Sequence, residues 1–155
     1  MPAADAIVLR VPVLYGGEEY DAESAVSVLC QLLNDGSKQV KASDYEIRYP
    51  SHTHDVAFIV VQLADRRLQD RAVKGVYHWC GQEPLTKYAM VQAIAKAHAL
   101  NADHVLPDRE PSKGAPRPHD SRLECGRLRE LGISRHTPFL EGVKEFSKFL
   151  VRPTA

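Results

Sequence analysis

The chain has no glycine-rich motif that could bind a nucleotide phosphate. Its nine glycines form neither a G-x-G-x-x-G fingerprint nor a G-x-x-x-x-G-K loop, and the adjacent pair Gly16-Gly17 lacks a third glycine. None of its six tyrosines is followed four residues later by a lysine. A general base made of a tyrosine and a lysine one helical turn apart is therefore absent from this polypeptide.

Composition disfavours several broad classes of function. The 155 residues carry 20 basic and 20 acidic side chains, so no net charge attracts nucleic acid. No apolar run approaches the length of a membrane span, and the N-terminus does not read as a signal peptide. With 44% hydrophobic and 26% charged residues, the sequence predicts a globular cytoplasmic protein that binds neither nucleic acid nor membrane.

The chain has few cysteines, and their spacing disfavours both disulfides and a metal site. Cys30, Cys80 and Cys125 are odd in number and far apart in the sequence. Neither a disulfide scaffold nor a C-x-x-C metal site is supported by this pattern. We interpret each cysteine as a reduced, buried, small hydrophobic residue, in keeping with a cytoplasmic location.

Hydrophobic periodicity predicts the alternating strands and helices of an α/β domain. Strands are expected at residues 7–14, buried on both faces and fraying at Pro12, near residues 46–49, and at residues 73–79. Helices are expected at residues 23–34, at 55–68, after Thr86, in a short segment after 121–124, and after Thr137-Pro138. The proline-rich segment 101–119 is expected to be an extended loop.

Helix ends and buried stripes are predicted from the same patterns. The predicted caps are an Asn34-Asp35-Gly36 C-cap, an N-cap at Ser51, Thr53 or Asp55, the Thr86 N-cap with a Leu85–Met90 hydrophobic staple, a Ser121–Glu124 capping box, and a Gly132 C-cap. The predicted buried stripes are Val56, Ile59, Val60, Leu63 and Ala64 in one helix and Phe139, Val143, Phe146 and Leu150 in the last.

His52, His54 and Asp55 form an H-x-H-D cluster that admits a metal site. In an extended chain the two imidazoles would project to one side, and Asp55 would add an oxygen ligand. The alternative, which we favour, is that Asp55 accepts backbone N–H groups at a helix start and the histidines are ordinary loop residues. The sequence therefore predicts no metal site.

Two further segments have residues suited to binding. His78-Trp79-Cys80 lies at a strand end, where open α/β sheets bind ligands, although Trp79 is explained more simply as a core residue. Arg117 lies between Pro116 and Pro118, which hold the backbone extended and expose a guanidinium suited to phosphate. A solvated loop arginine is an equal alternative for Arg117.

The motifs, in their order, resemble a known family. They are V-L-R-V-P-V-L-Y-G (8–16), E-S-A-V (23–26), P-S-H-T-H-D-V-A (50–57), K-G-V-Y-H-W-C-G (74–81), T-K-Y-A-M (86–90), R-P (117–118), L-G-I (131–133) and T-P-F (137–139). This set resembles the C-terminal half of extended short-chain dehydrogenase/reductases of the dTDP-4-dehydrorhamnose reductase type. Within that branch it is most similar to the regulatory β subunits of methionine adenosyltransferase.

The resemblance implies a partial domain over residues 1–155, comprising the last strands of a Rossmann-like fold and a small substrate-binding lobe without the glycine-rich N-terminal half. In a full-length protein, NADP(H) would contact the backbone of Pro12, Val13 and Leu14, and Arg117 would contact the substrate. The chain alone is expected to have no catalytic residues and to bind no cofactor.

The resemblance leaves three functions open. The first is a non-catalytic regulator that binds the methionine adenosyltransferase catalytic subunit. In that family a tail after the last helix contributes to docking, and here it is expected to be missing or very short, since only Val151–Ala155 follow the helix. The second is the substrate-binding half of a sugar-nucleotide reductase or epimerase, and the third is an interaction module without cofactor. An unpaired strand edge at residues 7–14 is also expected to favour a homodimer.

Overall fold

The computed structural model describes residues 5–150 and has an α/β fold with three parallel strand pairs, β1 with β5, β2 with β4 and β3 with β6. The strands are β1 (Ile7–Arg10), β2 (Leu14–Tyr15), β3 (Val40–Ser43), β4 (Ser51–His52), β5 (Gly75–His78) and β6 (Val105–Asp108). The α-helices are α1 (Gln31–Asn34), α2 (Thr53–Gln69), α3 (Lys87–Ala97), α4 (Gly126–Glu130) and α5 (Phe139–Gly142). The 3₁₀ helices are η1 (Asp21–Glu23), η2 (Ser27–Cys30) and η3 (Val143–Phe149). No helix in this described range is long and apolar enough to cross a membrane.

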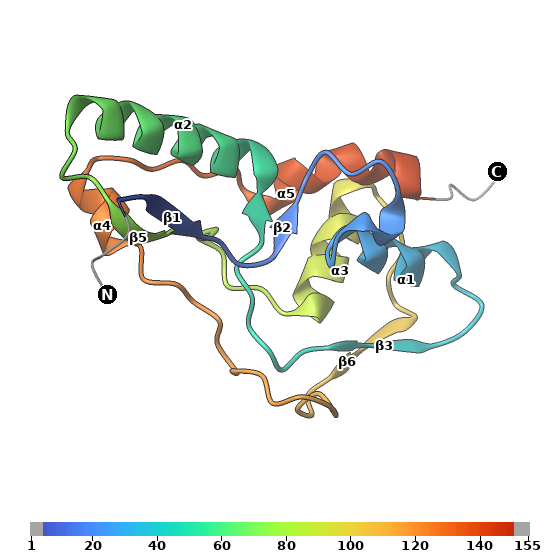
Figure 1. The fold of residues 1–155 in the computed structure, drawn as a ribbon. Coiled ribbons are helices and arrows are strands. Elements are labelled where there is room, and N and C mark those ends of the chain that lie inside the picture. The colour runs from blue at the N-terminus through green and yellow to red at the C-terminus, as the bar shows by residue number, and fades with distance from the viewer. Residues whose placement is uncertain (1–4, 151–155) are drawn as a thin grey trace.

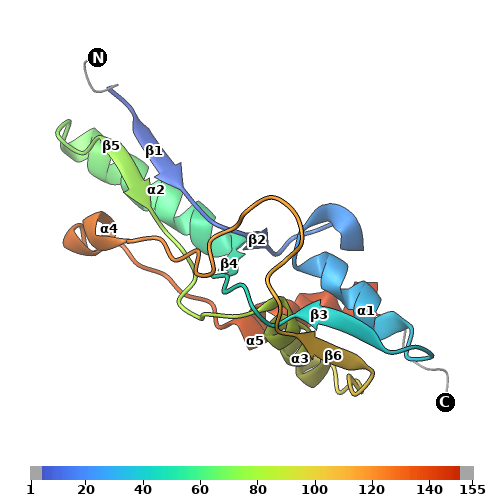
Figure 2. The ribbon, with the colours of Figure 1, turned by 90° about the horizontal axis from the view of Figure 1, so that it is seen from below.

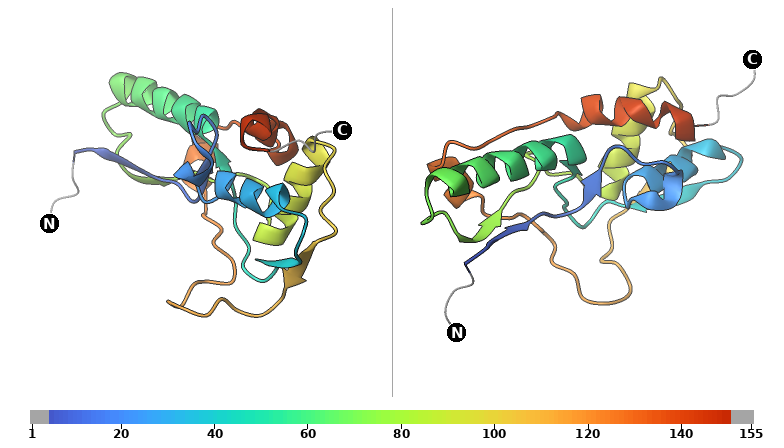
Figure 3. Two further views of the ribbon diagram at one scale, coloured as in Figure 1. Left: turned by 90° about the vertical axis from the view of Figure 1, so that its right-hand side faces the viewer. Right: turned by 45° about the horizontal axis from the view of Figure 1, so that its top comes forward.

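Two packed regions lie end to end, as Figures 1 and 2 show. In the first region, α2 lies along β1 and β5, and its core consists of Ile59, Leu63, Val73, Tyr77, Trp79, Leu128 and Ile133. In the second region, α3 packs against α5, η3 and β3, and its core includes Tyr15, Leu29, Met90, Ile94, Val105, Phe139, Val143 and Phe146. The segment between β6 and α4 projects away from the helices in both views of Figure 3.

The strand and helix predictions in the middle of the chain are confirmed. β5 and α2 lie where the periodicity places them, and α3 follows Thr86, whose hydroxyl accepts the N–H of Ala89 at 3.1 Å. Leu85 and Met90 contribute to the same core. The α2 N-cap was predicted wrongly, because the ring of His52 accepts the N–H of His54. Two members of the predicted α2 stripe, Val60 and Ala64, are exposed.

The first predicted strand is divided and is not buried on both faces. The break falls at residues 11–13, around Pro12, where fraying was expected. β1 alternates between half-buried and exposed residues, and Val8 is 48% exposed on one face. Within the described residues, β5 is the only strand that pairs with β1. β1 therefore has an open edge and an uncovered face.

The helix predicted at residues 23–34 is wrong at its start, and it is confirmed at residues 27–34, where η2 continues directly into α1. The Ser24 hydroxyl accepts the N–H of Ser27 at 2.9 Å, and the Ser27 hydroxyl donates to the carbonyl of Asp21 at 2.8 Å. Such side-chain bonds compete with α-helical hydrogen bonds. The expected C-cap is also wrong, since Asp35 at that position is extended and Gly36 has no positive φ.

A strand pair lies in segments predicted otherwise. β6 occurs inside the segment expected to be a loop, and it pairs with β3, which precedes the expected strand at 46–49. That expected strand is reduced to isolated bridges from Ile47 to Asp120 and from Arg48 to Leu85. Pro107 is tolerated in β6 because a two-stranded sheet leaves one edge of each strand without a partner.

The predictions near the C-terminus are partly confirmed. Gly132 ends α4 with φ +68°, but the capping box is wrong, because the Ser121 hydroxyl donates to the carbonyl of Ile47. The last helix is confirmed, but it begins at Phe139, one residue after the expected start at Pro138, and it continues as η3. Its N-cap residue is Pro138, and Thr137 bonds elsewhere.

Candidate functional site

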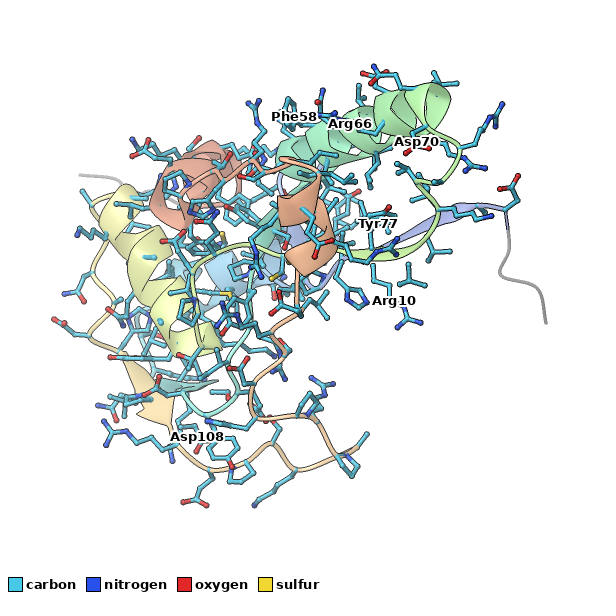
Figure 4. The ribbon with its side chains drawn as sticks, turned by 90° about the vertical axis from the view of Figure 1, so that its left-hand side faces the viewer. Arg10, Phe58, Arg66, Asp70, Tyr77 and Asp108 are labelled. Atoms are coloured by element: carbon cyan, nitrogen blue, oxygen red, sulfur yellow. The ribbon has the colours of Figure 1, made fainter. Side chains whose placement is uncertain are left out.

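The carboxyl ends of β1 and β5 lie side by side, at the edge where open α/β sheets bind ligands. Arg10 and His78 are register partners and the last residues of the two strands. Figure 4 shows Arg10 and Tyr77 on these strands, far from Asp108 at the end of β6. The candidate site is therefore formed by the segments that leave this edge, residues 11–17 after β1 and residues 79–82 after β5.

Ser51 holds these two segments together. Its N–H donates to the carbonyl of Val13 at 2.9 Å, and its hydroxyl accepts the N–H of Gly81 at 3.0 Å. The hydroxyl also donates to the carbonyl of Tyr49 at 3.0 Å, and the residue is fully buried. The sequence predicts no role for Ser51 beyond a helix cap, since its partner Gly81 is 30 residues away and no local pattern marks the contact.

Pro12, Val13 and Leu14 lie on this edge, as the sequence predicts for cofactor contacts. Val13 is partly buried against the second core, whereas Leu14 is 38% exposed. Leu14 lines a cavity of about 160 Å³ together with Tyr15, Gly16, Gly17, Glu18, Glu23, Ser24 and Thr53. The structure gives the segment an accessible surface, and its contact with a cofactor stays a prediction.

The same segment does not fit a dinucleotide phosphate. Gly16 and Gly17 have φ of +105° and +77°, but the N–H of Gly17 donates to the carboxylate of Glu145 at 3.2 Å. Glu18 and Glu23 also line the cavity, so the side chains around it repel a phosphate. The described residues around this cavity thus fit at most a part of a dinucleotide cofactor that carries no phosphate.

Tyr15 lies in the segment that leaves β1, and its environment is unsuited to a general base. It is 1% exposed, and its hydroxyl has no hydrogen-bond partner among the described residues. Burial, followed by the charges of Glu83 and Asp55, raises the pKa of Tyr15 far above its ordinary value. Its ring packs edge-on against His52 with the centroids 5.1 Å apart. Tyr15 is therefore a core residue.

Asp55 links the two packed regions. Its buried carboxylate, at the start of α2, accepts the N–H of Thr137 at 2.6 Å and the Thr137 hydroxyl at 2.9 Å. Nε of Arg135 donates to it at 3.2 Å. The sequence predicts that Asp55 accepts N–H groups at the start of its own helix. In the structure, the backbone N–H that donates to Asp55 belongs instead to Thr137, in the segment before α5. Asp55 therefore fixes that segment to α2.

The H-x-H-D residues point to separate partners. His52 caps α2 and approaches Glu145, with Nε2 3.5 Å from Oε1, whereas His54 is exposed and Asp55 faces Thr137. Within residues 5–150, no three His, Cys, Asp or Glu side chains are grouped as metal ligands. The side chains of this motif serve packing and capping.

A larger cavity, of about 380 Å³, lies beside the segment that leaves β5. Trp79 is a core residue here, as expected, and also lines the cavity. The walls of this cavity come from three stretches far apart in the sequence, namely Tyr49, residues 79–82 and residues 122–134. Cys80 and Cys125 both face this space, so the structure joins the H-W-C motif to the segment that follows Arg117.

Arg117 is exposed and lies in the segment between β6 and α4. No hydrogen bond or ion pair among the described residues joins its guanidinium to residues 12–14. The chain next to Arg117 is bonded to the segment between β3 and β4, since the N–H of Ile47 donates to the carbonyl of His119 at 2.7 Å. The role of Arg117 in substrate binding remains a prediction.

Glu46 also holds the segment between β6 and α4, near the start of that segment at Ser112. We expect this contact to make the free energy of unfolding depend on pH. The Glu46 carboxylate accepts the N–H of Ser112 at 2.9 Å and the Ser43 hydroxyl at 2.6 Å, and these bonds lower the pKa of Glu46 to about 2. Because the folded pKa lies below the unfolded value, this contribution is full above about pH 4.5 and is lost as the pH falls towards 2. Allowing for solvent screening, it amounts to about 1–2 kcal/mol.

Urea unfolding of the native chain and Glu46→Gln between pH 2 and 7 measures this contribution. We expect the variant to be less stable at pH 7, with the difference vanishing by about pH 2. A difference that is constant across this range would contradict the assignment. Glu124→Gln is the matched control, since Glu124 is exposed and pairs only with Arg129 in the described structure.

The chain is similar in sequence to known proteins. The family model described as the RmlD substrate binding domain matches residues 2–151. Methionine adenosyltransferase 2 subunit beta of Xenopus tropicalis is 43% identical over 141 residues, covering 90% of this chain and 42% of that protein. The subunit of the same name from Danio rerio is 39% identical over 143 residues, covering 90% of this chain and 44% of that protein. The chain thus spans less than half the length of these relatives.

Solved structures share the fold. A dTDP-4-dehydrorhamnose reductase from Clostridium acetobutylicum superposes with a TM-score of 0.72 at 20% identity, over 92% of this chain and 48% of that one. The reductase of the same name from Bacillus anthracis, solved in complex with NADP, has a TM-score of 0.70 at 18% identity, over 90% and 46% of the two chains. The predicted fold, the C-terminal part of an extended Rossmann-like reductase, is confirmed. The chain belongs to the RmlD substrate binding domain family.

Proposed function

We propose that this chain is the substrate-side half of a non-catalytic regulatory protein that binds the catalytic subunit of methionine adenosyltransferase. The observation that carries the proposal is sequence identity. The relatives named as β subunits are 39–43% identical across 90% of the chain, whereas the reductases and epimerases of similar fold are 15–21% identical. In sequence the chain is therefore about twice as similar to the β subunits as to the reductases and epimerases of similar fold.

The site supports a binding role. Tyr15 is buried without a lysine partner, and no nucleotide phosphate fits beside Gly17. We assign residues 1–155 to a single partial domain of a cytoplasmic protein. In a longer protein, Pro12, Val13 and Leu14 would contact NADP(H) through their backbone, and Arg117 would bind an anionic ligand.

The rate of S-adenosylmethionine synthesis tests the regulatory role. Purified catalytic subunit is assayed with increasing amounts of the chain, and a saturable change in rate is expected. The control is the chain unfolded by heat and cooled. A rate that is unchanged when the chain is in large excess would count against regulation by this half alone.

The alternative is the substrate half of a sugar-nucleotide reductase or epimerase. It is favoured by the fold, since the reductase from Clostridium acetobutylicum superposes over 92% of the chain. The corresponding test uses the longest natural form of the protein with NADPH and a 4-keto sugar nucleotide, and follows NADPH absorbance. Turnover would establish the alternative, and its absence would leave the regulatory proposal in place.

We expect the isolated chain to bind NADPH with a dissociation constant weaker than about 1 mM, because it lacks a helix N-terminus with a glycine-rich turn. The Glu145 carboxylate bound to the amide of Gly17 strengthens this expectation. Isothermal titration calorimetry measures it, with a full-length relative as the positive control. A micromolar dissociation constant for the isolated chain would contradict the prediction.

We also expect the isolated chain to self-associate through β1. Val8 and Val76 are register partners on one sheet face and are 48% and 40% exposed, and the outer edge of β1 has no strand partner in the described structure. Sedimentation velocity should show a dimer at high concentration.

Val8→Lys should shift the chain towards monomer, because a charge on an edge strand opposes pairing. The matched control is Val61→Lys on α2, where the native valine is 55% exposed. Equal effects of the two variants, or a native monomer at high concentration, would contradict the prediction.

A further inference from the structure

Two of the three cysteines, distant in the sequence, meet in the fold. Cys80 follows β5, and Cys125 directly precedes α4. Their sulfur atoms are 3.8 Å apart, although the residues are separated by 45 positions. Both thiols also point at one acceptor, the carbonyl of Leu123, at 3.5 and 3.4 Å. The carbonyl of Leu123 therefore holds both side chains in a defined orientation.

The cavity of about 380 Å³ beside the pair gives small reagents a route to it. Both cysteines line this cavity, with Cys125 partly exposed and Cys80 8% exposed. Cys30, in contrast, lies in the second core with no exposed surface. The chain thus offers two neighbouring thiols open to reaction and a third that serves as an internal reference.

We propose that Cys80 and Cys125 form a dithiol site that small disulfides of the glutathione class oxidise to an intramolecular disulfide. In the first step the Cys125 sulfur attacks the reagent, forming a mixed disulfide and releasing one reduced thiol. In the second step the Cys80 sulfur attacks the Cys125 sulfur, forming the protein disulfide and releasing the second reduced thiol. Two protein thiols are oxidised and one small disulfide is reduced, and the two thiol protons pass to the two released thiols.

The geometry needs only a small movement. A disulfide requires the sulfurs to approach to about 2.05 Å, which side-chain rotation can supply when they are already in contact. Cys125 precedes α4 in an irregular segment, so its side chain is not constrained by a surrounding helix. The proposal does not depend on the regulatory function proposed above, since it concerns only the chain's own thiols.

The site should react slowly at neutral pH. Burial, followed by the neighbouring Cys80 thiol, raises the pKa of Cys125 to about 11, so little thiolate is present at pH 7. The charged and titratable groups around the pair are Tyr49, Arg122, Glu124 and Arg129. The rate of oxidation should accordingly rise by about tenfold per pH unit between pH 7 and 9.

Oxidation should also stabilise the chain. The bond would join the end of β5 to the segment before α4 and constrain a long loop in the unfolded state. The expected rise in the thermal midpoint is on the order of 10 °C, and reduction with dithiothreitol should reverse it.

The experiment incubates the reduced chain with oxidised glutathione, unfolds it, alkylates the free thiols and maps them by mass spectrometry. Before alkylation, we expect an intact mass about 2 Da lower than that of the reduced chain. Cys30 should be alkylated, and the peptides that hold Cys80 and Cys125 should be linked. Cys30→Ser should behave as the native chain, whereas Cys80→Ser and Cys125→Ser should form no internal disulfide.

A second measurement avoids variants whose folding is altered. Phenylarsine oxide bridges two adjacent thiols, so the native reduced chain should bind one equivalent and then resist oxidation by glutathione. Three alkylatable thiols after oxidation at pH 9, a stable glutathione adduct without ring closure, or a disulfide that includes Cys30 would each overturn the proposal.

Discussion

Gly81→Ala should destabilise the chain by about 3–5 kcal/mol. A Cβ added at this position would lie far inside van der Waals contact with the carbonyl oxygen of Pro50 and 3.0 Å from its carbonyl carbon. Both are backbone atoms, so relief requires the two segments to separate. That movement would also break the bond from the Gly81 N–H to the Ser51 hydroxyl, now 3.0 Å long. Urea unfolding of the native and variant chains measures the loss.

Two control variants separate the steric effect from the others. Gly36→Ala places a Cβ no closer than 3.9 Å to its nearest neighbour and should change stability by less than about 1 kcal/mol. Ser51→Ala removes the hydrogen bond without the clash and should cost about 1–2 kcal/mol. If Gly81→Ala were as mild as Gly36→Ala, the close approach of Gly81 to Pro50 described here would be wrong.

Asp55→Ala should cost about 3–4 kcal/mol, because it removes three hydrogen bonds of a buried carboxylate and leaves the partly buried N–H and hydroxyl of Thr137 without that acceptor. Since Asp55 joins α2 to the segment before α5, the loss should appear first as local opening between the two packed regions. Hydrogen exchange of the Thr137 amide should accelerate more than that of amides in the middle of α3. Urea unfolding gives the total cost.

The matched control for Asp55 is its partner Arg135. The Arg135 side chain is 52% exposed, so its removal leaves the carboxylate bonded to Thr137 and should cost about 1 kcal/mol. An equal loss for Asp55→Ala and Arg135→Ala would mean that the ion pair, rather than the bonds to Thr137, holds the segment.

The parts of the fold that were predictable have local signals. α3 combines a threonine cap with helical spacing of Met90, Val91 and Ile94, so its start and buried face follow from the sequence. The strand pair β3–β6 has no such signal, because Lys41 is exposed and Pro107 suggests a loop. The start of the helix predicted at 23–34 is wrong because spacing shows which residues are apolar but not that Ser24 and Ser27 bond the backbone.

The candidate site was less predictable than the fold, because it is made by contacts between distant segments. The position of residues 12–14 at the strand edge followed from motifs, whereas the connection of Val13 to Gly81 through Ser51 did not. The approach of Cys80 to Cys125 was equally hidden, since their separation of 45 residues argued against a pair. Only the folded chain shows that one cavity borders both thiols.

The most direct test of the account is sedimentation velocity of this chain mixed with the catalytic subunit of methionine adenosyltransferase. We expect a complex that sediments faster than either component and contains both in a fixed ratio. The same chain mixed with an unrelated enzyme of similar size should give only the separate components. Independent sedimentation of the chain and the catalytic subunit at concentrations of about 10 µM would contradict the proposed regulatory function.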